Sequence, residues 1–172
     1  MYSEPSLDSA PVWLKLTTVL GQDTLLCSYK EDEDLGHRCL LTNDEGPADT
    51  LAFGKFRWNL IPVEWSDDFI ISNVEFGGRL YVSDYTFQSA EKTVASVYVR
   101  PANSTIDLRE VWHIEHIAGD LCRVINTFNG QVLCGTCVEA NSKRDRWAGV
   151  VDESGDDRNA CTFVMQLLEV GC

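Results

Sequence analysis

Residues 58–63 read Trp58-Asn59-Leu60-Ile61-Pro62-Val63, with an aromatic residue first and an apolar residue two places later. The same pattern returns as Trp112-His113-Ile114-Glu115-His116-Ile117 and as Phe163-Val164-Met165-Gln166-Leu167-Leu168. A weaker copy opens the chain as Leu14-Lys15-Leu16-Thr17-Thr18-Val19, and successive copies begin 44, 54 and 51 residues apart. Self-similarity at a period of about 50 residues is typical of a repeated architecture. The sequence therefore predicts three structural units.

Each aromatic stretch of the second and third units is followed by two β-prone runs that flank a turn dipeptide. Gly77-Gly78 and Asn129-Gly130 are these dipeptides. Glycine and asparagine tolerate the positive φ of a tight turn, so each pair of runs is expected to form a hairpin. Further β-prone stretches close the units at residues 50–53, 95–99 and 147–151. The polar stretches before these, at 42–49, 83–93 and 138–146, are expected to be loops or short turns.

Strand signals without a sustained helical period predict an all-β, antiparallel structure closed on itself, because closure removes exposed strand edges. This arrangement resembles a β-trefoil, in which six strands form a short barrel and three hairpins cap it. Residues 14–19 and 163–168 are expected to lie side by side and join the two ends of the chain. By strand alternation, the inward-facing core side chains are expected to be Trp58, Leu60, Trp112, Ile114, Phe163 and Met165.

The length of 172 residues predicts a single domain. We place an N-terminal tail at 1–11 and the domain at 12–170. Its units cover about 14–57 (unit one), 58–111 (unit two) and 112–168 (unit three). With 44% hydrophobic residues, the chain can bury a core without depending on disulfides.

The chain is acidic, with 27 acidic against 14 basic residues and a formal net charge of −13. This balance disfavours nucleic acid and heparin as partners, since their phosphates or sulfates must be met by Lys and Arg. No run approaches the roughly 20 apolar residues of a membrane span. The three histidines assemble no catalytic constellation, and His113 and His116 would alternate across a strand, which disfavours a shared metal ion. We therefore expect no enzyme activity, cofactor or metal.

Seven cysteines are many for a cytosolic chain of this size, and Asn103-Ser104-Thr105 is an acceptable glycosylation sequon. Both features favour secretion, with a cytoplasmic location as the alternative, since the polar start shows no signal peptide. Counting outward from the Asn129-Gly130 turn places Cys122 opposite Cys137, and a one-residue slip would favour Cys134 instead. Free thiols, or a redox or zinc role for Cys134-Gly135-Thr136-Cys137, are alternatives to this disulfide.

Two further disulfides are expected from position. Cys27 and Cys39 occupy comparable places in unit one, and Cys161 and Cys172 flank the last strand. An odd number of cysteines leaves at least one unpaired. The protein is expected to be a monomer, with dimerisation through that cysteine as the alternative.

The pattern Trp-x-Leu/Ile-x-x-Val followed by Ile-x-Asn-Val/Thr resembles the trefoil half of insect haemolymph 30K lipoproteins and microvitellogenin, which are secreted. In that family each unit continues into a basic loop and an aromatic-rich strand, and residues 143–151 follow this plan. The helical half of those proteins is absent. More distantly, the units resemble ricin-type lectins, whose strand signature is Gln-x-Trp. Here the Trp is kept at Trp58 and Trp112, and the Gln is missing.

The lectin resemblance implies acid-plus-aromatic sugar sites. The candidates are Asp84 with Tyr85, and Asp145 with Trp147. In such a site the ring stacks on the apolar face of a sugar. We therefore predict a secreted binding protein that recognises a carbohydrate or glycoprotein through loops of units two and three. One alternative is a protease inhibitor that acts through the loop 30–36 or 141–147, and another is a storage or scaffold protein.

Overall fold

The computed structural model describes residues 13–19, 23–31, 37–43, 54–102, 105–140, 145–152 and 161–168. The expected tail at 1–11 and the expected strand at 50–53 lie outside these residues. The strands are β1 (Trp13–Thr18), β2 (Thr24–Glu31), β3 (Arg38–Asn43), β4 (Trp58–Pro62), β5 (Phe69–Asn73), β6 (Arg79–Ser89), β7 (Lys92–Arg100), β8 (Val111–Ala118), β9 (Leu121–Asn126), β10 (Val132–Glu139), β11 (Asp145–Val151) and β12 (Phe163–Leu168). Short 3-10 turns, η1 (Gly54–Phe56) and η2 (Leu108–Glu110), precede β4 and β8.

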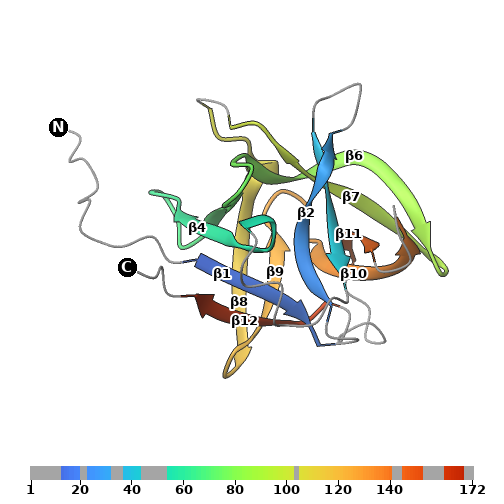
Figure 1. Cartoon of the computed structure of the whole chain (residues 1–172). Coiled ribbons are helices and arrows are strands. Elements are labelled where there is room, and N and C mark those ends of the chain that lie inside the picture. Colours follow the sequence, from blue (N-terminus) through green and yellow to red (C-terminus); the bar gives the residue numbers. More distant parts are fainter. Residues whose placement is uncertain are drawn as a thin grey trace.

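Six of these strands close into a barrel (Figure 1). The antiparallel ring runs β1–β12–β9–β8–β5–β4 and returns to β1 through the pairs Trp13–Asn59 and Leu14–Trp58. Closure pairs both edges of every barrel strand, so the barrel has no free edge. The predicted barrel is therefore confirmed.

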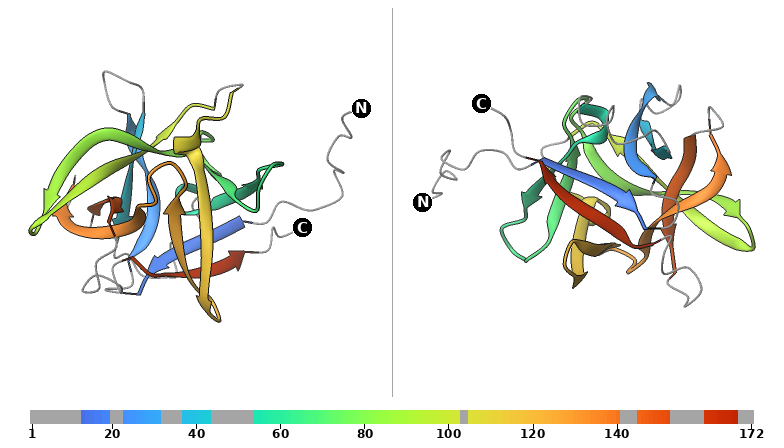
Figure 2. Two further views of the ribbon diagram at one scale, coloured as in Figure 1. Left: turned by 180° about the vertical axis from the view of Figure 1, so that it is seen from behind. Right: turned by 60° about the horizontal axis from the view of Figure 1, so that its bottom comes forward.

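The two ends of the described chain meet in this barrel, as expected. Strand β1 pairs along its whole length with β12, from Trp13 opposite Leu168 to Thr18 opposite Phe163. The two strands run together in both views of Figure 2. Because β5 pairs with β4 and β9 with β8 in the same way, β1 corresponds to the second strand of a unit. Residues 14–19 are thus not a copy of the aromatic strand.

Three hairpins, β2–β3, β6–β7 and β10–β11, form the cap. They join one another through the pairings β3–β7, β7–β11 and β11–β3. A glycine is required where β11 crosses β7, because a Cβ at Gly149 would lie 2.5 Å from the carbonyl oxygen of Ala95. A six-stranded barrel capped by three hairpins is the β-trefoil fold.

The two turn dipeptides have a different role from the one expected. They carry the chain from a barrel strand to a cap strand, and β9 meets β10 only at Ile125 opposite Val132. Buried asparagines fix these turns. The Asn73 side chain accepts from the N–H groups of Glu75 and Phe76, each at 3.1 Å, and Asn126 accepts from Phe128 at 3.1 Å. These bonds hold the turns independently of any long hairpin.

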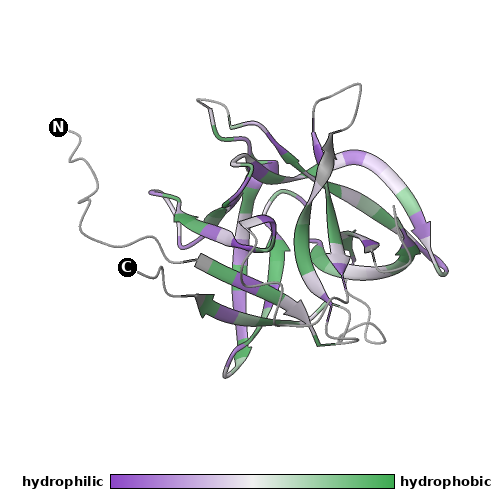
Figure 3. Cartoon of the chain, viewed as in Figure 1, coloured by the Kyte–Doolittle hydropathy of each residue, from purple (hydrophilic) through white to green (hydrophobic). Residues whose placement is uncertain are grey.

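The core lies inside the barrel and under the cap. Trp58, Trp112 and Phe163 are fully buried, and Leu60, Ile114 and Met165 pack against the same cluster. Each buried indole N–H reaches a backbone carbonyl, with Trp112 Nε1 donating to Leu80 at 2.9 Å. Hydrophobic and hydrophilic segments alternate along the strands in Figure 3, as expected when one face of each strand lines the core. Among the described residues, no helix is long and apolar enough to cross a membrane.

Candidate functional site

Each cap hairpin contains a β-bulge at the same place. In β6, Ser83, Asp84 and Tyr85 lie between the register pairs Val82–Val97 and Thr86–Ala95, so that three residues oppose Ser96 alone. In β10, residues 136–138 likewise oppose Trp147. In β2, residues 28–30 oppose Cys39. A bulge re-aims side chains and is frequent beside binding sites.

A hydroxyl residue opens each bulge and holds it in units two and three. Ser83 Oγ donates to the carbonyl oxygen of Ser96 at 2.8 Å and accepts from the Tyr85 N–H at 3.2 Å. Thr136 Oγ1 donates to the Trp147 carbonyl at 2.6 Å and accepts from the Val138 N–H at 3.3 Å. The two residues after each hydroxyl are therefore held in a fixed local backbone geometry.

In unit two, these two residues are the predicted pair Asp84 and Tyr85. The Asp84 side chain is 85% exposed and Tyr85 is 58% exposed. Adjacent residues on a regular strand face opposite ways, so the bulge explains why both reach solvent. Asp84 Oδ1 lies 2.8 Å from Arg109 Nη1. An open ring, a carboxylate and a guanidinium are thus gathered on one surface.

A row of aromatic rings continues inward from Tyr85. The Tyr85 ring meets Tyr98 edge-on at 6.4 Å between centroids, and Tyr98 lies 6.1 Å from its cross-strand partner Tyr81. His37 follows, 5.3 Å from Tyr81 and hydrogen-bonded to its hydroxyl. Tyr81, Tyr98 and His37 were not among the residues predicted for the site. A correct β6–β7 register would have revealed the tyrosine pair.

The arginine of this surface is positioned by η2. Asp107 caps the turn by accepting from the Arg109 N–H at 2.9 Å, and this bond is the main reason why the pKa of Asp107 is lowered. Glu110, with 1% of its side chain exposed, binds Arg79 at 3.1 Å and Arg100 at 2.6 Å. The Arg109 guanidinium also lies over the Phe128 ring at 4.9 Å. Arg109 thereby connects unit two to a turn of unit three.

A hollow of about 580 Å³ opens beside the aromatic row. His37 and Arg100 line this hollow, and both also contact the Tyr81 ring of the row. Asp107 and Glu110 line the hollow as well. The lining thus offers hydrogen-bond donors and acceptors next to the row of aromatic rings. We call Asp84, Tyr85, Tyr98 and Arg109 the unit-two surface.

The predicted pair of unit three is arranged differently. Trp147 is half-buried against a cluster that contains Leu26, Leu41 and Phe56, so it is no open stacking platform. Asp145 begins β11 opposite Asn43. Trp147 therefore offers no open ring, whereas Asp84 and Tyr85 are both exposed.

The expected disulfide pairings are wrong, although Cys161 does form a disulfide. Cys134 is bonded to Cys161, with 4.2 Å between their Cα atoms, while Cys27, Cys122 and Cys137 are free thiols. The pairs Cys27–Cys39, Cys122–Cys137 and Cys161–Cys172 therefore do not form. The Cys122–Cys137 pair fails because β9 diverges from β10. Cys122 therefore lies in the barrel, opposite His116 on β8 and Phe163 on β12.

Two of the free thiols are core residues. Burial raises the pKa of Cys27 to about 12 and that of Cys122 to about 11. Both thiols therefore stay protonated and unreactive near neutral pH. Within the described part of the chain, no group of three or more His, Cys, Asp or Glu side chains could hold a metal ion.

Several predicted positions lie outside the described residues. These are the sequon asparagine Asn103, Cys172, and residues 32–36 and 141–144 of the two candidate inhibitor loops. The glycosylation and protease-inhibitor hypotheses remain predictions from the sequence.

Comparison with known proteins identifies the fold and no family. No protein-family profile and no curated protein matches the chain. Among solved structures, an SDF2-like protein from Arabidopsis thaliana superposes with a TM-score of 0.73 at 10% identity, over 91% of this chain and 92% of that one. A salivary protein of the cysteine- and tryptophan-rich family from Culex has a TM-score of 0.65 at 13% identity, over 95% and 98%.

A lectin from Polyporus squamosus, solved with a sialylated trisaccharide epitope, has a TM-score of 0.61 at 12% identity. The match covers 92% of this chain and 49% of the lectin chain. The resemblance to insect haemolymph 30K proteins remains a prediction from the sequence. At such low identities the similarities concern the β-trefoil fold alone.

Proposed function

We propose that this protein is a non-enzymatic binding protein that recognises a carbohydrate, free or on a glycoprotein, through the unit-two surface. The observation that carries this proposal is the bulge of β6, which exposes Asp84 and Tyr85 side by side with Arg109 2.8 Å from the carboxylate. Sugar hydroxyls both donate and accept hydrogen bonds. They can therefore use the carboxylate as an acceptor and the guanidinium as a donor.

The apolar face of a sugar ring needs a flat apolar partner. Tyr85 offers such a partner, and the edge contact with Tyr98 limits its freedom, which lowers the entropy lost on binding. Phe128, half-exposed on the turn after β9, extends the apolar surface from unit three beside Arg109. This is consistent with recognition through units two and three.

Secretion is part of the proposal. A disulfide between Cys134 and Cys161 persists in oxidising compartments and is uncommon in the cytosol. The structural neighbours add a salivary protein and a sugar-binding lectin that share this fold. These likenesses support the proposal only by showing what the fold can carry.

The test is a glycan array followed by calorimetry with the best glycan. Tyr85→Ala should weaken binding by about tenfold, or about 1.4 kcal/mol, through loss of the stacking ring. Asp84→Asn should weaken it as well, since an amide is a poorer acceptor. The matched control is Trp65→Ala, which removes a 63% exposed ring from the turn after β4.

Two results would overturn the proposal. One is the absence of binding to any glycan at high protein concentration. The other is equal weakening by Tyr85→Ala and Trp65→Ala, which would show that the unit-two surface has no special part in binding.

A further inference from the structure

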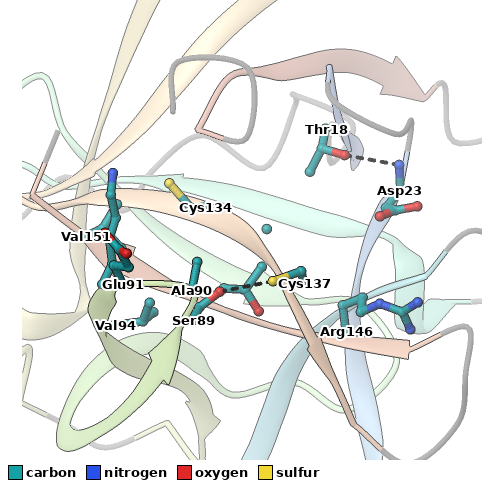
Figure 4. Close-up of a pocket in the computed structure, with 13 residues that line it drawn as sticks. Thr18, Asp23, Ser89, Ala90, Glu91, Val94, Cys134, Cys137, Arg146 and Val151 are labelled. Atoms are coloured by element: carbon teal, nitrogen blue, oxygen red, sulfur yellow. Dashed lines mark hydrogen bonds between the residues drawn. The ribbon is translucent and has the colours of Figure 1, made fainter. Parts of the chain in front are cut away.

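A second recess lies between the tip of the β6–β7 hairpin and the bulge of β10 (Figure 4). Its volume is about 730 Å³, within the usual range for small-molecule pockets. Residues 89–92 and Val94 of unit two and residues 134–137 of unit three line it, together with Arg146 and Val151 of β11 and Thr18 and Asp23 beside β1. None of the residues of the unit-two surface belongs to this lining.

The walls of the pocket are mainly apolar and well anchored. Val94, Val151 and Cys134 are buried, and they belong to one packed cluster with Cys161. The Cys134–Cys161 disulfide ties the β10 wall to the residue just before β12. No aromatic ring is present among the described lining residues. Aliphatic walls without a stacking ring suit a hydrophobic body better than a sugar ring.

The polar part of the lining has no net formal charge. Asp23 and Glu91 contribute two negative charges, and Lys92 and Arg146 contribute two positive charges. Three hydroxyl side chains, Thr18, Ser89 and Thr136, lie on the same lining. An ionic ligand would lose hydration and meet a like charge as well as an opposite one, whereas an uncharged ligand avoids this cost.

We infer that this pocket is a second binding site, which takes a small uncharged amphiphile. The ligand class is an aliphatic body with one hydroxyl, as in a medium-chain alcohol. The aliphatic body would lie in the hollow between residues 89–92 and 134–137, above the buried side chains of Val94 and Val151. The hydroxyl would exchange hydrogen bonds with the polar rim. This inference concerns a separate ligand and a separate place from the sugar proposal.

Cys137 provides a reporter of occupancy. It is exposed on the bulge of β10, it lines the pocket, and its Sγ lies 3.6 Å from Ser89 Oγ (Figure 4). A bound ligand should shield this thiol from an alkylating reagent. Cys39, half-buried on β3 and outside the pocket lining, gives an internal reference in the same sample.

The experiment measures iodoacetamide labelling of Cys137 by peptide mass spectrometry on the folded full chain. Three additives that share an eight-carbon alkyl chain are compared at equal concentration: 1-octanol, octanoate and octylamine. We expect 1-octanol to slow labelling of Cys137 relative to Cys39 by about threefold, as for a site occupied about two-thirds of the time. The two charged analogues should protect less.

A variant with a side chain that fills the pocket is compared with a matched control. Ala90→Trp, at an exposed residue of the hairpin tip that lines the pocket, should abolish the protection by 1-octanol, whereas Ala118→Trp on the exposed end of β8 should preserve it. A thermal melt of each variant confirms folding. Absence of protection in the wild type, equal protection by all three additives, or protection retained in Ala90→Trp would each overturn the inference. Tyr85→Ala should leave the protection unchanged, which separates this result from the sugar test.

Discussion

Thr136 donates its hydroxyl hydrogen to the carbonyl oxygen of Trp147 at 2.6 Å, across the bulge of β10. Ser83 makes the same bond to Ser96 in unit two, at 2.8 Å. In each bulge the hydroxyl thus gives the opposing carbonyl a hydrogen bond in place of the backbone one that the extra residues displace. The β6 bulge exposes Asp84 and Tyr85 of the unit-two surface, and the β10 bulge exposes Cys137 beside the second pocket. The two hydroxyls therefore help to hold these residues in place.

Removing the hydroxyl of Thr136 tests this role. Thr136→Val keeps the shape and β-branching but leaves the Trp147 carbonyl and the Val138 N–H without their partner. We expect a loss of about 1–3 kcal/mol in the free energy of unfolding, measured by urea titration. Thr86→Val, at an exposed position of β6, should change it by less than about 0.5 kcal/mol. Equal effects would show that the bond contributes nothing.

The indole of Trp112 is expected to be indispensable to the barrel. It is fully buried, and its Nε1 donates to Leu80 at 2.9 Å. Trp112→Ala should cost about 3–5 kcal/mol, comparable to the whole stability of many domains. Trp65→Ala, which removes a 63% exposed ring, serves as the control and should shift the melt little. A cooperative, unshifted melt of Trp112→Ala would contradict the barrel assignment.

The lowered pKa of Asp107 predicts a dependence of stability on pH. Its folded-state pKa lies below the ordinary 3.8, chiefly through the Arg109 N–H bond. The ionised carboxylate therefore stabilises the fold above the unfolded-state pKa, and this contribution is lost as pH falls through the folded-state value. Asp107→Asn should be less stable than wild type at neutral pH, and the difference should shrink below about pH 4.

The measurement for this prediction is urea unfolding across the acidic range. Asparagine also caps a turn, so the substitution isolates the charge. Asp120→Asn, at an exposed turn residue between β8 and β9, is the control. If the difference in unfolding free energy between Asp107→Asn and wild type stays constant with pH, the ionised carboxylate is not the source of the stabilisation.

The cysteines should divide into three classes of reactivity. Non-reducing peptide mapping should find Cys134 linked to Cys161. In the native protein at about pH 8, Cys137 should be alkylated quickly, while Cys27 and Cys122 should react only after denaturation, because their pKa values are about 12 and about 11. A Cys122–Cys137 crosslink, or fast native labelling of Cys122, would contradict the structure.

The disulfide itself should stabilise the fold. It joins residues separated by 27 positions, and closing such a loop is worth about 3.5 kcal/mol in the chain-entropy account. The double substitution Cys134→Ser with Cys161→Ser should lower the unfolding free energy by about this amount, measured without reductant. Reduction of the wild type should produce a similar loss, whereas the variant should not respond to reductant.

The repeated aromatic stretch is sufficient to predict the barrel and its core. Aromatic and apolar residues at alternate positions report burial directly, so Trp58, Trp112 and Phe163 can be placed in the core from the sequence alone. The register of the cap cannot be obtained in the same way. A count outward from Asn129-Gly130 assumes that paired strands stay together, and here β9 leaves β10 after Ile125 and Val132. The predicted Cys122–Cys137 pair is wrong for this reason.

The candidate site shows a similar division. Asp84 and Tyr85 were proposed because the resemblance to lectin trefoils implies an acid beside an aromatic ring, and the structure exposes both side chains. Arg109 and Tyr98 were missed because they reach the site through the fold, 25 and 13 residues further along the chain than Asp84 and Tyr85. The stretch 83–93 was expected to be a loop, yet β6 continues to Ser89 and β7 begins at Lys92. Its polar residues reflect a hairpin that projects into solvent.

The pairing of β1 with β12 also bears on how the protein is made. The barrel ring cannot close until residues 163–168 have left the ribosome, so the first strand must wait for almost the entire chain before it finds its partner. Long-range closure of this kind slows folding and leaves strand edges open in the meantime. Joining the two ends and opening the chain in the turn between β8 and β9 would make the β1–β12 contact local, and the β8–β9 pairing would become the new long-range closure of the barrel.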